Sequence, residues 1–392
     1  MNVGRTVFTQ LMEFIPMHEF RVAVKRYTGN RRVRRFSCWD QFLCMAFAQL
    51  TYRESLRDIE TCLRSLGPKL YHTGIRGSVA RSTLADANEH RSWELYRDVA
   101  LALIQRARSL YRNDTYFREL ETAVYAFDST TIELCLSIFP WARAAGHTTT
   151  NAAIKLHTLF DIHANIPTFL RISSADRHDV LMLDQLAYEA GAYYLLDRGY
   201  MDFARLKRID TAQAFFIIRA KRRLRYTRVY SHAVDKTQGI LVDQTISLDV
   251  WRTHEAYPDH VRRIKIFDAE RHRTLVFLTN NFLLEPLVIA QLFRARWQIE
   301  LFFKWIKQHL RIKAFFGTSP NAVKTQVWIA VSIYALVAIV KKELGLRHSL
   351  YTILQILSVT MFEKEPLYHV LADAQHLIHD SSPANQLNLF DF

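Results

Sequence analysis

The last third of the chain contains a stretch, Leu292–Leu310, whose hydrophobic positions repeat with the period of a helix. It has no Pro or Gly, and its apolar residues recur mostly at gaps of three and four, which predicts a helix with one face in a core. A stripe of four residues lies beside that face: Phe293, Arg296, Glu300 and Lys307. Taken alone, the stripe is typical of a solvated face with an Arg296–Glu300 pair, worth about a few tenths of a kcal/mol.

Short runs rich in strand-forming residues dominate the middle of the chain. Two of them stop at a carboxylate: Ala123–Phe127 at Asp128, and Tyr193–Leu196 at Asp197. Between these runs the pattern predicts three further strands and a helix. They are Ile132–Ile138, Ala153–Phe160, Pro167–Ser173 and the helix His178–Ala190. A helix at Asp202–Ile209 and a strand at Ala214–Ile218 follow.

The last three strands before the helix are expected to form a meander, and the order of three such strands, helix, strand, helix, strand is that of an RNase H-like fold. We therefore expect an α/β chain with a mixed sheet and flanking helices. In that fold the first and fourth strands are neighbours, so Asp128 and Asp197 would lie side by side. Glu300 would come from a later helix that packs across the sheet.

Three converging carboxylates would be suited to phosphoryl transfer. They can hold two Mg²⁺ ions about 4 Å apart. One ion would activate an attacking water or 3′-hydroxyl, and the other would stabilise the leaving oxygen. Each Asp alone is also typical of a turn or a helix cap. The two Asp residues, taken together with the helix stripe that contains Glu300, favour a catalytic cluster of Asp128, Asp197 and Glu300.

A basic, β-rich block separates the strand region from the Leu292–Leu310 helix. Four cations alternate along a predicted strand, which would place them on one face: Arg219, Lys221, Arg223 and Arg225. A solvated strand face is the alternative, but like charges in a row repel unless a polyanion screens them, so we expect contact with the DNA backbone. Three more strands are predicted: Gly239–Leu248, Val261–Asp268 and Thr274–Thr279.

The N-terminal region is basic and has a helical pattern. Helices are predicted at Trp39–Leu50 and at Ser55–Leu66. A third predicted helix begins at Ser82 or Thr83, either of which can serve as its N-cap. Two short helices with a turn-rich link could form a DNA-binding helix-turn-helix. A helical bundle that only packs on the rest of the chain is the alternative.

Composition limits the class of protein. The 392 residues carry a formal net charge of +14, and 49% of them are hydrophobic, which indicates a globular protein with a polyanionic partner, nucleic acid before membrane. The longest apolar run, Trp328–Val340, is too short to span a bilayer. No signal peptide is evident at the start. The four cysteines show no metal-binding spacing, so we expect reduced thiols and a cytoplasmic location.

The predicted organisation has four parts. A helical, DNA-binding region would occupy residues 1–95, and a linker helix residues 96–120. The RNase H-like catalytic domain would occupy residues 121–345, with the β-rich insertion at about 220–280, before a C-terminal helix and tail at 346–392.

At this point the residues resemble a known family, the bacterial DDE transposases of insertion-sequence family four, the cut-and-paste type. The family motif is Tyr, two residues, Arg, three residues, Glu, six residues, Lys. The stripe Phe293, Arg296, Glu300, Lys307 has the same gaps and differs only in Phe for Tyr. The "DST" string at Asp128 and the β-rich insertion also match the family. So does the string at Asp197, which reads "DRGY".

The resemblance implies roles for these residues. Asp128, Asp197 and Glu300 would ligate two Mg²⁺ ions, with Mn²⁺ as a substitute, and Arg296 and Lys307 would grip phosphates of double-stranded DNA at the element ends. Phe293 lacks the hydroxyl of the family Tyr, which puts one DNA contact in doubt. A homodimer synapsed on paired DNA ends, acting in the bacterial cytoplasm, is also implied.

Two other functions fit the same residues. The chain could be an inactive relic that binds DNA and represses transposition, for which Phe293 is the only favourable feature. It could also be a nuclease of the same fold that hydrolyses DNA without joining strands. Strand-transfer products would separate these possibilities.

Overall fold

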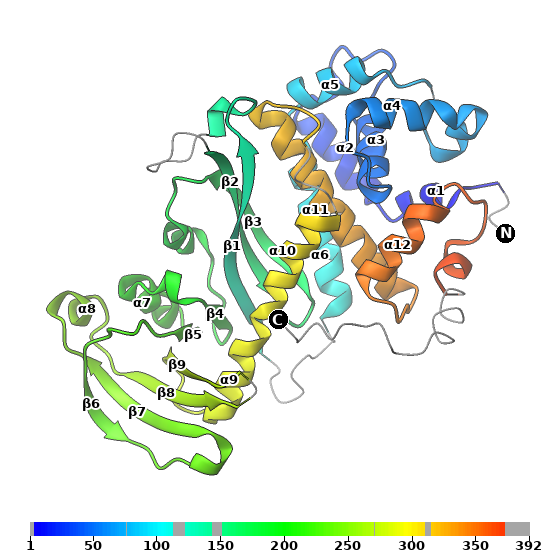
Figure 1. The fold of residues 1–392 in the computed structure, drawn as a ribbon. Helices are drawn as coiled ribbons and strands as arrows, with labels where there is room; N and C mark the ends of the chain where they lie inside the picture. The colour runs from blue at the N-terminus through cyan, green and yellow to red at the C-terminus, as the bar shows by residue number, and fades with distance from the viewer. Residues whose placement is uncertain are drawn as a thin grey trace. The chain divides into compact units, whose positions relative to one another are not determined.

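The computed structural model describes residues 4–75, 77–112, 122–142, 151–269, 271–309 and 315–372. The chain divides into two compact units (Figure 1). The first is made of Met1–Tyr111 together with Lys304–Phe392, and the second is Arg112–Phe303. The first unit therefore combines the two ends of the sequence, and the second unit lies between them.

Helices make up the described part of the first unit. In chain order they are α1 (Val7–Met12), α2 (Met17–Arg26), α3 (Cys38–Leu50), α4 (Leu56–Ser65), the 3-10 helix η1 (Gly67–Thr73), α5 (Arg81–His90), α6 (Glu94–Tyr111), α11 (Pro320–Glu343) and α12 (Leu350–Thr360). The predicted helices at Trp39–Leu50 and Ser55–Leu66 are confirmed by α3 and α4.

The core of this unit forms around α11. It is apolar on nearly every side, and it packs along α6 and against α3, α5 and α12. A helix that is hydrophobic all round is stable only when it is enclosed. It is long and apolar enough to cross a membrane by length and composition, but 94% of its most apolar window is buried inside the protein. We therefore interpret α11 as a core helix.

The link between α4 and α5 differs from the helix-turn-helix prediction. It runs from Leu66 to Ala80 and contains η1, whereas a helix-turn-helix has a tight turn of about three or four residues. The predicted cap is also wrong, because α5 begins at Arg81 with Ala80 as its N-cap, so Ser82 and Thr83 lie inside its first turn. These two helices therefore do not form the predicted motif.

The second unit is built on one nine-stranded sheet with the order β3-β2-β1-β4-β5-β9-β8-β7-β6. Its strands are β1 (Val124–Cys135), β2 (Asn151–Asp161), β3 (Ile166–Ser174), β4 (Tyr193–Leu196), β5 (Phe215–Arg219), β6 (Tyr226–Ser231), β7 (Ile240–Leu248), β8 (Val261–Asp268) and β9 (Arg273–Thr279). The pairs β1–β4 and β4–β5 are parallel, and the others are antiparallel. The predicted α/β class with a mixed sheet is confirmed.

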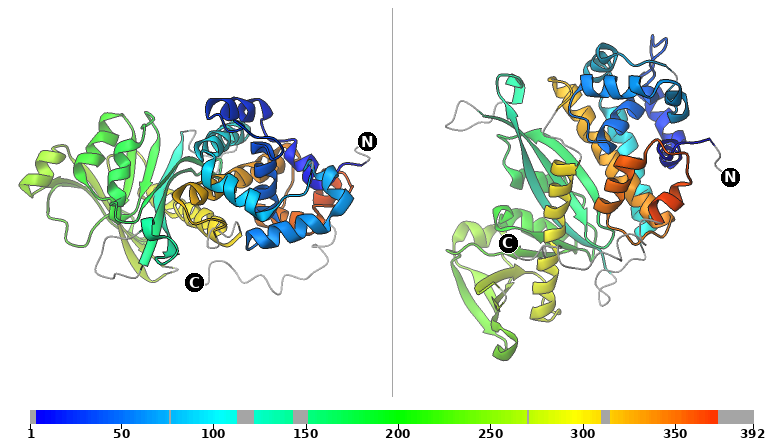
Figure 2. Two further views of the ribbon diagram at one scale, coloured as in Figure 1. Left: turned by 90° about the horizontal axis from the view of Figure 1, so that it is seen from above. Right: turned by 45° about the vertical axis from the view of Figure 1, so that its right-hand side comes forward.

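Helices cover both faces of this sheet (Figure 2). On one face α7 (Phe203–Thr211) and the 3-10 helix η3 (Asp179–Gln185) enclose a core that includes Phe127, Leu196 and Ile218. On the other face lie α9 (Pro286–Ala295) and α10 (Trp297–His309), where the rings of Phe160 and Phe302 are 5.3 Å apart. The short helix α8 (Trp251–Ala256) packs on α7 and β7. Side chains that alternate along a strand therefore reach one helical layer or the other.

Four details of the sequence prediction are corrected by the structure. The runs Ala123–Phe127 and Ile132–Ile138 belong to one strand, β1, and the helix predicted from His178 is the 3-10 helix η3. β5 ends at Arg219, so Lys221, Arg223 and Arg225 lie in the loop before β6 and not on one strand face. The helix predicted at Leu292–Leu310 is two helices, α9 and α10, that meet at Arg296.

Candidate active site

Two carboxylates and an arginine lie in one row across the three parallel strands of the sheet. Phe127 pairs with Leu196, and Leu196 with Ile218, all with side chains in the α7 core. The residues that follow these three are Asp128, Asp197 and Arg219. Because successive side chains alternate in direction, this row faces the layer of α9 and α10.

Arg296 joins this row to the third carboxylate. Its Nη1 donates a hydrogen bond to Asp128 Oδ2 at 2.9 Å, and its Nη2 donates one to Glu300 Oε1 at 2.5 Å. The Arg296 side chain is only 13% exposed, against 21% for Asp128 and 31% for Glu300. One guanidinium therefore bridges two carboxylates at the edge of the core and offsets one of their two negative charges.

The junction of the two helices presents Arg296 to the sheet. Around the junction the backbone makes tight i to i+3 hydrogen bonds, from Arg296 N to Phe293 O and from Ile299 N to Arg296 O. Glu300 follows one turn later on α10, which is the spacing that lets it share the guanidinium.

Burial and charged neighbours exert opposing influences on the carboxyl group of Asp128. Burial raises the pKa of Asp128, and the negative charges of Glu300 and Asp197 raise it further. The guanidinium of Arg296 and the Ser129 backbone N–H, which donates to Oδ1 at 2.8 Å, act against that rise in pKa. The three predicted carboxylates are thus close enough to influence one another's charge.

A group of arginines borders the carboxylates on the β5 side. Burial lowers the pKa of Arg219, and the positive charges of Arg198, Arg273 and Arg296 lower it further, while Asp197 raises it. These arginines come from separate elements, and sequence reasoning missed Arg198 and Arg273. The position of Arg198 directly after Asp197 was an available signal, whereas Arg273 is brought in only by the pairing of β9 with β5.

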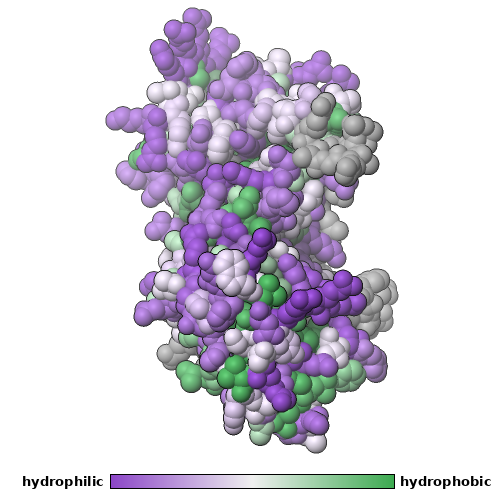
Figure 3. Space-filling model, turned by 90° about the vertical axis from the view of Figure 1, so that its left-hand side faces the viewer, coloured by the Kyte–Doolittle hydropathy of each residue, from purple (hydrophilic) through white to green (hydrophobic). Residues whose placement is uncertain are grey.

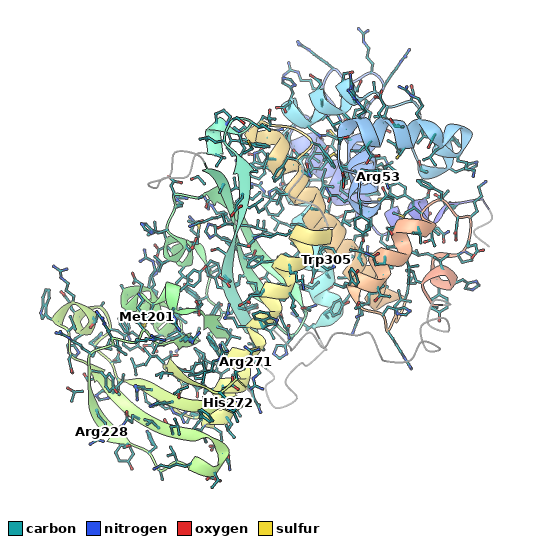
Figure 4. The ribbon with its side chains drawn as sticks, viewed as in Figure 1. Arg53, Met201, Arg228, Arg271, His272 and Trp305 are labelled. Carbon is teal, nitrogen blue, oxygen red and sulfur yellow. The ribbon has the colours of Figure 1, made fainter. Side chains whose placement is uncertain are left out.

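The remaining predicted residues lie around this centre. The Phe293 ring packs on Phe277 at 4.9 Å, and the Arg296 guanidinium carbon lies 5.7 Å from the centre of the Phe293 ring. Lys221, Arg223 and Arg225 are exposed in the β5–β6 loop. Figure 4 shows Arg228 projecting from β6, which adds a cation to the insertion.

Lys307 lies farther along α10, half-buried, in the part of the helix that belongs to the first unit. On the face of the molecule in Figure 3, hydrophilic residues predominate and hydrophobic side chains form small separate groups.

The chemistry of the donor set suits a hard divalent cation. Asp128, Asp197 and Glu300 offer only carboxylate oxygens, the ligands that Mg²⁺ prefers in proteins. Within the described ranges no three acidic, His or Cys side chains are already spaced to hold a metal ion. This agrees with the position of Arg296, whose guanidinium lies between two of the three acids.

Two family models match the chain. The model described as "Transposase DDE domain" matches residues 119–336, and a domain of unknown function, DUF4372, matches residues 3–76. The first match covers more than half of the chain and contains all three acids. The chain therefore belongs to the DDE transposases, and the resemblance found in its sequence is confirmed.

Curated relatives have the same description. A putative transposase of Sinorhizobium fredii is 32% identical over 266 residues, 67% of this chain and 72% of the relative. A probable transposase for insertion sequence element IS5377 of Geobacillus stearothermophilus is 29% identical over 211 residues, 53% of this chain and 54% of the relative. A putative transposase for insertion sequence element IS4SA of Synechocystis is 22% identical over 362 residues, 89% of this chain and 96% of the relative.

Among solved structures, the piggyBac transposase in a synaptic complex with hairpin DNA is similar at a TM-score of 0.46 and 8% identity, over 96% of this chain and 82% of that one. A likeness at this level does not establish a common fold. The family match identifies the protein as an enzyme of a class that acts on DNA with divalent metal ions. The predictions of enzyme class and of DNA as partner are confirmed at that level.

Proposed function

We propose that this protein excises an insertion sequence from DNA and joins its 3′-hydroxyl ends to target DNA. The observation that carries the proposal is the convergence of three acids. Asp128 lies inside β1, Asp197 follows the end of the neighbouring strand β4, and Glu300 shares Arg296 with Asp128. The strand order supports an RNase H-like core. So does the pairing, because β1–β2 and β2–β3 are antiparallel pairs, whereas β4 and β5 join β1 as parallel strands.

Asp128, Asp197 and Glu300 would hold two Mg²⁺ ions, for which Mn²⁺ would substitute. When bound, these ions supply an activated nucleophile and neutralise the leaving oxygen. The role of the protein is to hold the carboxylates in position. The backbone N–H of Ser129 and the rigid pairing of β1 with β2 hold Asp128 in place.

Arg296 would exchange partners during the reaction. In the structure it is the counter-ion of Asp128 and Glu300. Its Nε is buried and makes no hydrogen bond in the described part of the chain. With the carboxylates occupied as metal ligands, the guanidinium of Arg296 would be available to bind a DNA phosphate in a bidentate manner. Lys307 would add a second phosphate contact, and Phe293 would support Arg296 by packing rather than by hydrogen bonding.

The arginines beside Asp197 would guide the DNA strand into the site. The positive charges of Arg198 and Arg273 act on Arg219, and a phosphodiester backbone would relieve this repulsion. Lys221, Arg223 and Arg225 would continue this path along the β5–β6 loop. The active species would be a homodimer that synapses both element ends.

The test is cleavage of a DNA fragment that carries the ends of the native element, with Mg²⁺, by wild type and Glu300→Ala. The proposal requires cleaved and strand-joined products from wild type, and DNA binding without cleavage from the variant. Cleavage by wild type with no joined product would favour a plain nuclease. Binding by both proteins with no cleavage, even with Mn²⁺, would favour a DNA-binding relic.

A further inference from the structure

A dense group of cations lies far from the carboxylates in sequence, on α2 and the loop between α2 and α3. Seven cations occur between residues 21 and 35, with no acidic residue among them: Arg21, Lys25, Arg26, Arg31, Arg32, Arg34 and Arg35. All seven side chains are exposed. We call the loop part of this surface, residues 27–37, the arginine loop.

These cations have almost no counter-ions of their own. In the residues that the structure describes, only Arg26 of the seven forms an ion pair, with Asp98 at 2.6 Å. The closest acid in sequence is Glu19, which precedes the group. Exposed like charges without partners destabilise a folded protein by repulsion, so such a surface is typical of a polyanion-binding site.

The arginine loop has a fixed backbone. Asn30 Oδ1 accepts a hydrogen bond from Cys38 N at 2.8 Å, and Arg91 Nη1 donates one to Ser37 O, also at 2.8 Å. A Cβ on Gly29 would lie 2.7 Å from Cys38 Sγ and 2.9 Å from Leu95 Cδ1, so the loop lies directly against α3 and α6. A ligand would therefore meet arginines on a backbone that is already ordered, at a small cost in entropy.

A shallow hollow of about 290 Å³ borders the loop. Phe20 and Trp39 line it with their rings, which meet edge to face at 5.1 Å. Arg21 and Lys25 also line it. Cations beside an aromatic surface can contact both a phosphate and the sugar next to it.

We infer that α2 and the arginine loop form a binding surface for the phosphodiester backbone of duplex DNA, separate from the carboxylate site. The inference rests on the proposed function, because that function supplies DNA as the partner. The surface replaces the predicted helix-turn-helix, since the exposed residues of α5 include a paired Asp86 and His90 rather than a run of cations. The guanidinium group of arginine can donate two hydrogen bonds to phosphate oxygens. We therefore expect contact with the DNA backbone that is independent of base sequence.

The experiment compares two quadruple variants of the full chain with equal loss of charge. One carries Arg31, Arg32, Arg34 and Arg35 changed to Ala. The control carries Arg57, Arg64, Lys69 and Arg81 changed to Ala, which are exposed cations on α4, η1 and α5. Fluorescence anisotropy measures the Kd for a labelled duplex of unrelated sequence over a range of salt concentrations.

We expect the arginine-loop variant to bind at least about tenfold more weakly near physiological salt, and the slope of log affinity against log salt to fall by about three. The control should change the Kd by less than about threefold. Equal losses in both variants, or none in the first, would overturn the inference. A variant with all four arginines changed to Lys should keep most of the affinity, and its failure to do so would argue against a charge-based backbone contact.

Circular dichroism of each variant checks the fold, and the Lys variant remains informative if the Ala variant does not fold. If wild type itself fails to bind the duplex, the proposed function fails and not only this surface. If wild type and the Ala variant bind the duplex equally, only this surface fails. Selective loss of binding to vesicles of anionic lipid, with duplex binding unchanged, would reassign the surface to a membrane.

Discussion

The carboxylate site and the arginine loop are both charged, but they differ in whether a counter-ion is present within the protein. At the site, Asp128 and Glu300 are half-buried and share Arg296 as a counter-ion within the protein. In the arginine loop, Arg31 and its neighbours are exposed, and no ion pair is described for them. The first arrangement can exchange its internal counter-ion for another cation, and the second requires an external anion. A net charge of +14 therefore does not say where DNA binds or where it is cut.

The largest expected effect is a loss of DNA cleavage at the carboxylate site while DNA binding by the arginine loop is kept. Asp128→Asn removes one negative charge from the cluster, and we expect cleavage of element-end DNA to fall at least about 1,000-fold because the metal ligands are incomplete. DNA binding through the arginine loop should persist. Glu133→Gln, an exposed acid on the same strand, is the matched control and should cleave normally. Gel assays of cleavage and anisotropy measure the two properties, and cleavage by Asp128→Asn near the wild-type rate would refute the assignment.

A second prediction concerns pH, to which only the buried region should respond. His157 lies on β2 opposite Ser129, its side chain is fully buried, and burial lowers its pKa to about 4. The unfolded chain takes up this proton near pH 6.5, so stability falls as pH drops from 6.5 to 4, by about 3 kcal/mol for this group.

Urea denaturation across that pH range measures this loss. His157→Gln should be less sensitive to acid than wild type, and His254→Gln, an exposed control, should match wild type. Parallel curves for wild type and His157→Gln would contradict the prediction.

The third prediction tests Arg296 as an internal counter-ion. Arg296→Gln leaves Asp128 and Glu300 without their cation, so we expect Mn²⁺ to bind about tenfold more tightly in the absence of DNA. Isothermal titration calorimetry measures that affinity. Arg294→Gln, on the exposed side of α9, serves as a control. Weaker Mn²⁺ binding in Arg296→Gln would mean that the arginine supports the metal site instead of competing with the ion.

The smallest expected effect comes from Phe293→Tyr. The ring should keep its packing on Phe277, and the added hydroxyl could donate to a phosphate beside Arg296. One such hydrogen bond should strengthen binding of element-end DNA by about threefold. Competition binding against unlabelled DNA of unrelated sequence measures the gain. A loss of affinity would show that the hydroxyl disturbs the contact between Phe277 and Phe293.

The central sheet was predictable because its strands are buried on both faces. The apolar runs before Asp128 and Asp197 are continuous, so the side-by-side position of these two acids followed from the sequence, although β1 continues past Asp128 to Cys135. Glu300 followed from helical periodicity. These signals are local, and they depend on burial that tertiary structure then supplied.

Features that depend on distant contacts were not predictable. The junction at Arg296 interrupts a stretch with uniform helical pattern, and only its contact with Asp128 explains its position. Lys221 and Arg225 alternate as in a strand, but nothing on the partner side pairs with them, so they form a loop. Arg273 joins the site through the register of β9, which its own neighbours in sequence do not reveal.

The division of the chain also determines the order in which it can fold during synthesis. The apolar side of α6 is covered by α11, which is made more than 200 residues later, because the whole second unit lies between them. On the ribosome, Arg112–Phe303 can complete its sheet while the N-terminal helices still lack a core. A stop codon before Pro320 would therefore remove α11 and α12 from the C-terminal end but unfold the N-terminal end, where the arginine loop lies.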